Sequence, residues 1–183
     1  MQKNNLIELM KKAFIILLAT ATLTTCKNET KPEESQKTKT TTQRDTTPKV
    51  TGIGGIFFKS KSVKGTKEWY GKNLGLAITD WGSAFEFRNA HRPDEINYLS
   101  WGVFKDSTDY FNPSTKEFMI NYRVQNLEGL VRNFKKNGVT IVDSIQVYDY
   151  GKFLHIMDAD GNKIELWEPV DSIFTKMGGP TTK

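Results

Sequence analysis

The apolar positions between residues 50 and 170 follow the same order twice. An alternating stretch at 54–60 precedes a segment with apolar residues at helical spacing, and Gly75 ends that segment. The order recurs from 118 to 137, where Gly138 ends the second helical segment. Alternation predicts a strand, helical spacing predicts a helix, and glycine favours the left-handed C-cap. Three strand-like runs follow each helix, at 76–81, 83–89 and 97–104, and at 140–148, 152–158 and 163–169.

An internal repeat supports this pattern. A shift of 64 residues sets 54–73 over 118–137, so that Ile56 falls on Ile120, Gly65 on Gly129 and Tyr70 on Phe134. Matching residues at matching structural positions indicate a duplicated unit. The sequence therefore predicts an α+β domain over 50–183, built from two tandem βαβββ modules at about 52–110 and 116–170.

The repeat ends in the hairpin "DADGNKIEL" (158–166). With the two modules, this hairpin resembles the vicinal oxygen chelate superfamily, which includes glyoxalases, bleomycin- and fosfomycin-resistance proteins and extradiol dioxygenases. The resemblance covers Gly52 to Pro169. It implies a cupped mixed sheet with helices on its outer face and a ligand or metal site inside the cup.

The hairpin also predicts which side chains share a face. Gly161 suits the left-handed position of a three-residue loop, so Asp158 faces Asn162. His155 then faces Glu165, and Phe153 faces Trp167. Side chains alternate along a strand, so the opposite face carries four aliphatic residues that suit packing under a helix. These are Leu154, Ile156, Ile164 and Leu166.

The first strand of each module adds residues to the predicted cup. Alternation along 118–124 turns Met119, Asn121 and Arg123 inward, and the repeat places Gly55, Phe57 and Lys59 beside them. Apolar walls with a few polar groups are typical of a ligand site. The candidate ligand-binding residues are Trp167, Trp101, Asn121, Arg123, Phe57, Phe153 and Met119.

Few of the metal-ligand positions implied by the resemblance carry a suitable side chain. The first-strand positions fall on Gly55 and Met119, and the last-strand position of module one falls on Ser100 or Trp101. Divalent ions of this kind prefer imidazole and carboxylate ligands. Only Glu165 is retained, so tight binding of a divalent metal is not expected, and no other cofactor is identified.

Glu165 and His155 are the candidate catalytic pair, and three interpretations of Glu165 stay open. It contacts a ligand or acts as a general base whose pKa an apolar cup raises. It forms a different metal site with His155. Or it is a structural carboxylate held by hydrogen bonds. The corresponding functions are metal-independent lyase or isomerase chemistry and non-enzymatic binding or sequestering of a small molecule.

The N-terminal region predicts export. Three lysines precede the apolar run "AFIILLATATLTT" in residues 1–25, which is typical of a signal peptide. Cys26, the only cysteine, follows "LTT", and this resembles the lipobox of bacterial lipoproteins, apart from Thr25. The alternative is an ordinary buried or free cysteine. Residues 26–49 are polar and predict a disordered tether. We expect a lipid-anchored protein of the cell envelope.

The charge distribution argues against a nucleic-acid partner. The chain carries a formal charge of +5, but residues 50–183 hold 17 basic and 16 acidic residues, so +4 lies in the first 49 residues. Nucleic-acid binding needs clustered positive charge. The expected partners are a small molecule, the membrane through the anchor, and a second copy in a homodimer, as is common for the superfamily.

Overall fold

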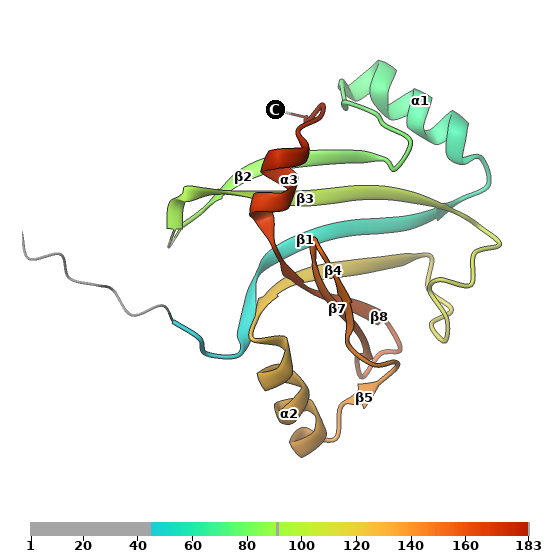
Figure 1. Ribbon diagram of the computed structural model, residues 1–183. Coiled ribbons are helices and arrows are strands. Elements are labelled where there is room, and N and C mark those ends of the chain that lie inside the picture. Colours follow the sequence, from blue (N-terminus) through green and yellow to red (C-terminus); the bar gives the residue numbers. More distant parts are fainter. Residues whose placement is uncertain (1–44, 91, 183) are drawn as a thin grey trace, which may run out of the picture. The chain divides into compact units, whose positions relative to one another are not determined.

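The computed structural model describes residues 45–90 and 92–182 (Figure 1). The predicted signal peptide, Cys26 and most of the tether lie outside the described residues. Within the described part, no helix is long and apolar enough to cross a membrane. The elements are β1 (Lys49–Ser60), α1 (Val63–Leu74), β2 (Ser83–Asn89), β3 (Arg92–Lys105), β4 (Phe118–Gln125), α2 (Leu127–Asn137), β5 (Thr140–Ile141), β6 (Gln146–Tyr148), β7 (Gly151–Met157), β8 (Lys163–Pro169) and α3 (Asp171–Met177).

One mixed sheet contains all the strands. Seven of them follow the order β2-β3-β1-β4-β8-β7-β5, and β6 pairs with β7. β1 and β4 pair antiparallel and join the two modules, while the β1–β3 and β4–β8 pairs are parallel. The predicted α+β class with a cupped mixed sheet is confirmed.

The β1–β4 seam requires glycine in β1. The seam register breaks between Ile53 and Gly55. A Cβ on Gly54 would overlap the side chain of Asn121 and crowd those of Arg123 and Trp167. Glycine at this position therefore lets β1 pass close above the side chains that β4 and β8 direct into the cup.

The predicted helices end at their glycines. The Ser62 hydroxyl accepts a hydrogen bond from the Gly65 N–H at 3.2 Å, and the Asn126 side chain caps α2 in the same way through Gly129. Gly75 and Gly138 adopt φ of 72° and 70°, as the left-handed C-cap requires. Repeated capping at equivalent positions agrees with the internal duplication.

The outer face of the sheet packs under α1 and α2. Leu154, Ile156 and Leu166 form a buried cluster with Val124 and with residues of α2, and Ile164 packs against it. The predicted aliphatic face of the hairpin is therefore confirmed. Its predicted register is also confirmed, since His155 pairs with Glu165 and Phe153 with Trp167.

Three segments differ from the sequence prediction. Residues 76–81 form no strand: Thr79 and Gly82 exchange two backbone hydrogen bonds and make a tight turn instead. The run 140–148 divides into β5 and β6 because Asp143, between them, accepts a hydrogen bond from the His155 N–H at 2.9 Å. Helix α3 was not predicted, and it contacts the inner face of the sheet through Phe174, which packs on Tyr98 and Trp167.

Candidate functional site

Glu165 lies on the inner face of β8 with only 3% of its surface exposed. Asn121 is its neighbour on β4, and the Asn121 Nδ2 donates to Glu165 Oε1 at 2.6 Å. The second oxygen, Oε2, accepts from His155 Nε2 at 2.9 Å and from the Tyr110 hydroxyl. Both oxygens of the carboxylate are thus engaged by protein donors.

His155 lies between two carboxylates. Its Nδ1 is 2.6 Å from Asp143 Oδ2, and its Nε2 contacts Glu165. An ionised carboxylate only accepts hydrogen bonds, so contact with a carboxylate at each ring nitrogen favours the imidazolium form, which has an N–H at both positions. Burial lowers the pKa of His155, but the hydrogen bonds to Glu165 and Asp143 outweigh it and raise the pKa overall.

The same hydrogen bonds decide the protonation of Glu165. Burial raises its pKa, but hydrogen bonds from His155, Tyr110 and Asn121 reverse this and lower the pKa below its ordinary value. The pKa shift is therefore opposite in direction to the raised pKa that the sequence analysis considered for a general base. Burial and the charge of Glu165 raise the pKa of Tyr110, which stays a donor. The arrangement matches the interpretation of Glu165 as a structural carboxylate.

The segment 106–117 closes the cup over Glu165. The Tyr110 ring stacks on Phe104 at 5.2 Å, and Lys163 Nζ donates to the Tyr110 carbonyl at 2.6 Å. Phe111 is fully buried, and the Ser114 hydroxyl donates to the Gly161 carbonyl at 2.7 Å. The protein's own side chains therefore fill this end of the cup.

The residues around Glu165 do not fit the metal that the resemblance implies. Gly55 has no donor, Met119 is fully buried, and Ser100 pairs with Gly55 across the strands. Within 45–90 and 92–182, no cluster of three or more His, Cys, Asp or Glu side chains could hold a metal ion. Both nitrogens of His155 already contact carboxylates, so it offers no free lone pair to a metal.

The aromatic candidates divide between the two faces. Phe153 stacks on Trp167 inside the cup at 5.9 Å, and Phe57 packs edge-on against Phe104. Trp101 points the other way and packs against Phe58 and Tyr70 beneath α1. The predicted position of Trp101 in the cup is wrong. In the pairing of β1 with β3, Gly102 lies opposite Phe57, and Trp101 lies opposite Ile56.

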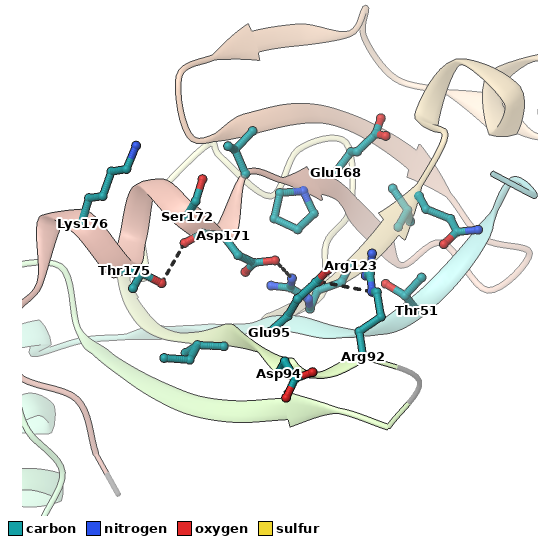
Figure 2. Close-up of a pocket in the computed structure, with 15 residues that line it drawn as sticks. Thr51, Arg92, Asp94, Glu95, Arg123, Glu168, Asp171, Ser172, Thr175 and Lys176 are labelled. Carbon is teal, nitrogen blue, oxygen red and sulfur yellow. Dashed lines mark hydrogen bonds and ion pairs between the residues drawn. The ribbon is translucent and has the colours of Figure 1, made fainter. Parts of the chain in front are cut away.

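A cavity of about 660 Å³ opens at the other end of the cup, between β3, β4 and α3 (Figure 2). Thr51, Ile96 and Val124 line part of it. Its charged lining residues are Arg92, Asp94, Glu95, Arg123, Glu168, Asp171 and Lys176. Arg92 pairs with Glu95 at 3.2 Å, and Glu168 accepts the N–H groups of Asn126 and Leu127 at the start of α2.

Arg123 is the buried cation of this cavity, with 2% of its surface exposed. Its NH1 donates to the Tyr98 carbonyl at 3.0 Å, and its NH2 forms an ion pair with Asp171 (Figure 2). The guanidinium also lies 5.2 Å from the Trp167 ring and 5.7 Å from the Phe87 ring. The sequence predicted Arg123 in the cup, and the structure places it there.

Three important residues were missed by the sequence analysis. Tyr110 lies in a segment without periodicity. Asp171 begins a helix of seven residues, and only its acidic start and the following Gly178 signal that helix. Asp143 had a usable signal, because a carboxylate directly after Ile141 and Val142 interrupts a run that otherwise favours a strand.

No protein-family model matches the sequence, and no curated protein matches it significantly. Solved structures do resemble the domain. A variant of methylmalonyl-CoA epimerase from Streptomyces coelicolor, in complex with 2-nitronate-propionyl-CoA, has a TM-score of 0.50 and 12% identity over 67% of this chain and 99% of that chain. The Mn(II)-bound glyoxalase from Novosphingobium aromaticivorans has a TM-score of 0.48 and 15% identity over 66% and 40%.

A glyoxalase/bleomycin resistance protein/dioxygenase superfamily member from Vibrio splendidus 12B01 has a TM-score of 0.42 and 12% identity over 67% of this chain and 99% of that chain. At these identities the likeness concerns the fold alone. With the strand order and the paired modules, it shows that the domain has the vicinal oxygen chelate fold.

The first prediction concerns metal content. Glu165 is the only retained ligand position, and its oxygens already accept three hydrogen bonds. We expect elemental analysis of the dialysed protein to find well under one equivalent of Mn, Fe, Ni, Zn or Co, and a chelator to leave the melting temperature unchanged. A stoichiometric metal that Glu165→Ala abolishes would contradict this prediction.

The second prediction concerns pH. Because the folded state raises the pKa of His155, its stabilising contribution is complete below the ordinary value of 6.5 and is lost as the pH rises through the raised pKa. At pH 6, His155→Gln should lower the free energy of unfolding by about 3 kcal/mol, since it leaves two carboxylates without their cation. The deficit should shrink towards pH 9 in urea unfolding followed by tryptophan fluorescence.

His91→Gln, at the only other histidine, is the control for this series. The pH dependence that comes from Glu165 has the opposite direction. Because its pKa is lowered in the folded state, its stabilising contribution is present above pH 4.5 and is lost as the pH falls through the lowered pKa. A His155→Gln deficit that stays constant or grows from pH 6 to pH 9 would argue against a buried imidazolium.

Proposed function

We propose that this protein binds a small organic molecule without converting it, in the cavity of about 660 Å³ at the α3 end of its cup. The observation that carries the proposal is the contrast between the two ends of the cup. The Glu165 end is closed by Tyr110, and both carboxylate oxygens of Glu165 accept hydrogen bonds from the protein, whereas the Arg123 end is hollow. The volume lies within the range of about 300 to 1,000 Å³ that is usual for ligand sites.

The lining supports binding more than catalysis. A general base needs a carboxylate or imidazole within hydrogen-bond reach of the substrate. Glu165 lies beneath Tyr110 with a lowered pKa, and both ring nitrogens of His155 contact carboxylates. In the cavity, Glu95 and Asp171 are paired with arginines. The Streptomyces coelicolor epimerase, which holds a CoA derivative, is one instance of small-molecule binding on this fold.

Lyase or isomerase chemistry through Glu165 is the alternative function. It would require segment 106–117 to move, because Tyr110 covers the carboxylate. It would also require Glu165 to accept a proton, and the lowered pKa of Glu165 makes it a weak base. The two functions differ in whether a bound molecule is recovered unchanged.

The third prediction tests binding against turnover. A metabolite panel is screened by thermal unfolding of the purified protein, and hits are then incubated and recovered for mass spectrometry. A ligand at 100 times its Kd stabilises by about 2.7 kcal/mol, which raises the melting temperature by several degrees. We expect Thr51→Tyr, which places a bulky ring in the cavity wall, to reduce the shift, and the ligand to be recovered intact.

Glu165→Gln is the matched control in this assay, since it alters the closed end of the cup and should leave the ligand's Kd unchanged. Conversion of a hit to product by the wild type, lost in Glu165→Gln, would refute binding without turnover and support the enzymatic alternative.

We further propose that the protein is exported and anchored to a membrane of the cell envelope through lipid on Cys26. The support is in the sequence: a signal-like run in residues 1–25, a single cysteine directly after it, and a polar segment from 26 onward. Stable anchoring requires more than one acyl chain, and the lipid of bacterial lipoproteins supplies several. A homodimer stays a prediction from the resemblance.

The fourth prediction tests the anchor. Cells expressing the protein are fed a fatty-acid analogue, and the purified chain is examined for label and for its partition into the membrane fraction. We expect the wild type to be labelled and Cys26→Ala to lose both label and membrane association. Equal labelling of the two proteins would show that Cys26 is not the lipidated residue.

A further inference from the structure

Helix α3 places one carboxylate and one aromatic ring inside the cup. Asp171 and Phe174 are three residues apart, so they share a face of the helix. Asp171 pairs with the buried Arg123 (Figure 2). The Phe174 ring lies 5.4 Å from Trp167 and 5.5 Å from Tyr98. The groups that α3 contributes are therefore those of a small aromatic acid.

α3 is weakly stabilised by its own sequence. It has seven residues, none of them buried, and Val170 at its N-cap makes no side-chain capping bond. Helices this short are unstable in water without tertiary contacts. Regions with few buried contacts and exposed backbone open more readily than the core. Contacts of Asp171 and Phe174 with the cup therefore hold the helix in place, together with a hydrogen bond from the Tyr98 hydroxyl to Thr175 at 3.3 Å and a backbone hydrogen bond from Thr182 to Ala84 at 2.8 Å.

The polar groups around Asp171 do not form all of their possible hydrogen bonds. Asn97 donates to Asp171 Oδ2 at 3.3 Å, but the Oδ1 atoms of Asn97 and Asp171 are buried and have no hydrogen-bond partner among the described residues. A buried acceptor without a donor destabilises the state that contains it. The docked position of α3 is thus weaker than its ion pair alone suggests.

Moving α3 away from the sheet would join the cavity to the space that Phe174 occupies beside Trp167 and Tyr98. Arg123 would keep its bond to the Tyr98 carbonyl and lose its only carboxylate, and Trp167 would lose the ring that covers it. A desolvated guanidinium without an anion is strongly unfavourable. The opened site therefore favours an anion with an apolar group beside it.

We propose that α3 is a built-in occupant of the ligand site and that the ligand is an aryl carboxylate, which displaces Asp171 from Arg123 and Phe174 from Trp167 and Tyr98. This inference rests on the proposed function, because it identifies the ligand class of the same cavity. Arginine binds carboxylates through paired N–H donors, and aromatic rings pack edge-on or offset against one another.

The charge of the cavity favours a monoanion. Its lining carries three basic and four acidic side chains, and one of the acids is Asp171 itself. Lys176 also lies on α3, so displacement of the helix leaves two basic side chains, Arg92 and Arg123, and three acidic ones, Asp94, Glu95 and Glu168. Arg92 is already paired with Glu95 at 3.2 Å, so Arg123 is left to bind the ligand. A phosphate with a double charge would meet one buried cation and uncompensated carboxylates.

The fifth prediction tests the displacement by hydrogen exchange on the purified protein, with 4-phenylbutyrate as the probe and neutral 4-phenylbutanol as its matched control. We expect the acid to bind and to speed exchange of the amides of 171–177, while the alcohol binds at least about tenfold more weakly. Asp171→Asn should bind the acid about tenfold more tightly, because the internal competitor no longer pairs with Arg123.

Asp94→Asn is the control for charge, because it removes an acid from the same cavity, makes no ion pair with Arg123, and should change the affinity less than about twofold. Phe174→Ala keeps the Arg123 pair and empties the ring site, so it should also bind the acid more tightly. The Phe174→Ala variant therefore still tests the displacement if Asp171→Asn fails to fold.

The contradicting outcomes separate this inference from the proposed function. Binding of 4-phenylbutyrate with unchanged or slower exchange in 171–177 would overturn the displacement and leave a cavity ligand in place. Equal binding of the acid and the alcohol would contradict the inference that the ligand binds through a carboxylate. No binding of the acid to the wild type, Asp171→Asn or Phe174→Ala would overturn the inference, even if another panel ligand still binds the cavity.

Discussion

The buried carboxylate of Glu165 is the constraint on which the inner face of the sheet depends. A carboxylate with 3% exposure is stable only if hydrogen bonds and a counter-charge replace water. His155 supplies the charge from β7, Asn121 supplies an amide from β4, and Tyr110 supplies a hydroxyl from the segment between the modules. Asp143 completes the set by holding the far side of the imidazole. One acid thus ties three strands of the second module to the segment that closes the cup.

This closure is the reason why we place the proposed ligand site at the other end of the sheet. The sequence resemblance implies a metal ligand at the position of Glu165, but its oxygens already accept hydrogen bonds from protein donors. Arg123, two residues beyond Asn121 on β4, brings a second buried charge to the open end. Its partner is Asp171 on a short helix, a contact that can exchange, whereas the Glu165 network involves three strands and a packed loop.

Periodic features were predictable from the sequence, and features that depend on tertiary contacts were not. The hairpin register followed from Gly161, and the helix ends followed from Gly75 and Gly138, because local backbone preferences set them. The position of Trp101 depends on the pairing of β1 with β3, which local alternation leaves open. The pKa of Glu165 depends on Tyr110, which approaches from 55 residues away in the chain. The hairpin register predicts His155 opposite Glu165, but neither the burial of Glu165 nor its contact with Tyr110 is encoded in the neighbouring residues.

The protonation of His155 is the most direct test of the account. The chain has two histidines, so the ¹⁵N resonances of their rings can be separated with His91→Gln. At pH 7.5 we expect both ring nitrogens of His155 to show the shifts and one-bond N–H couplings of an imidazolium held between Asp143 and Glu165. A neutral ring at this pH, with one nitrogen unprotonated and free to bind a proton, metal or substrate, would contradict the closed network and return Glu165 and His155 to the candidates for catalysis.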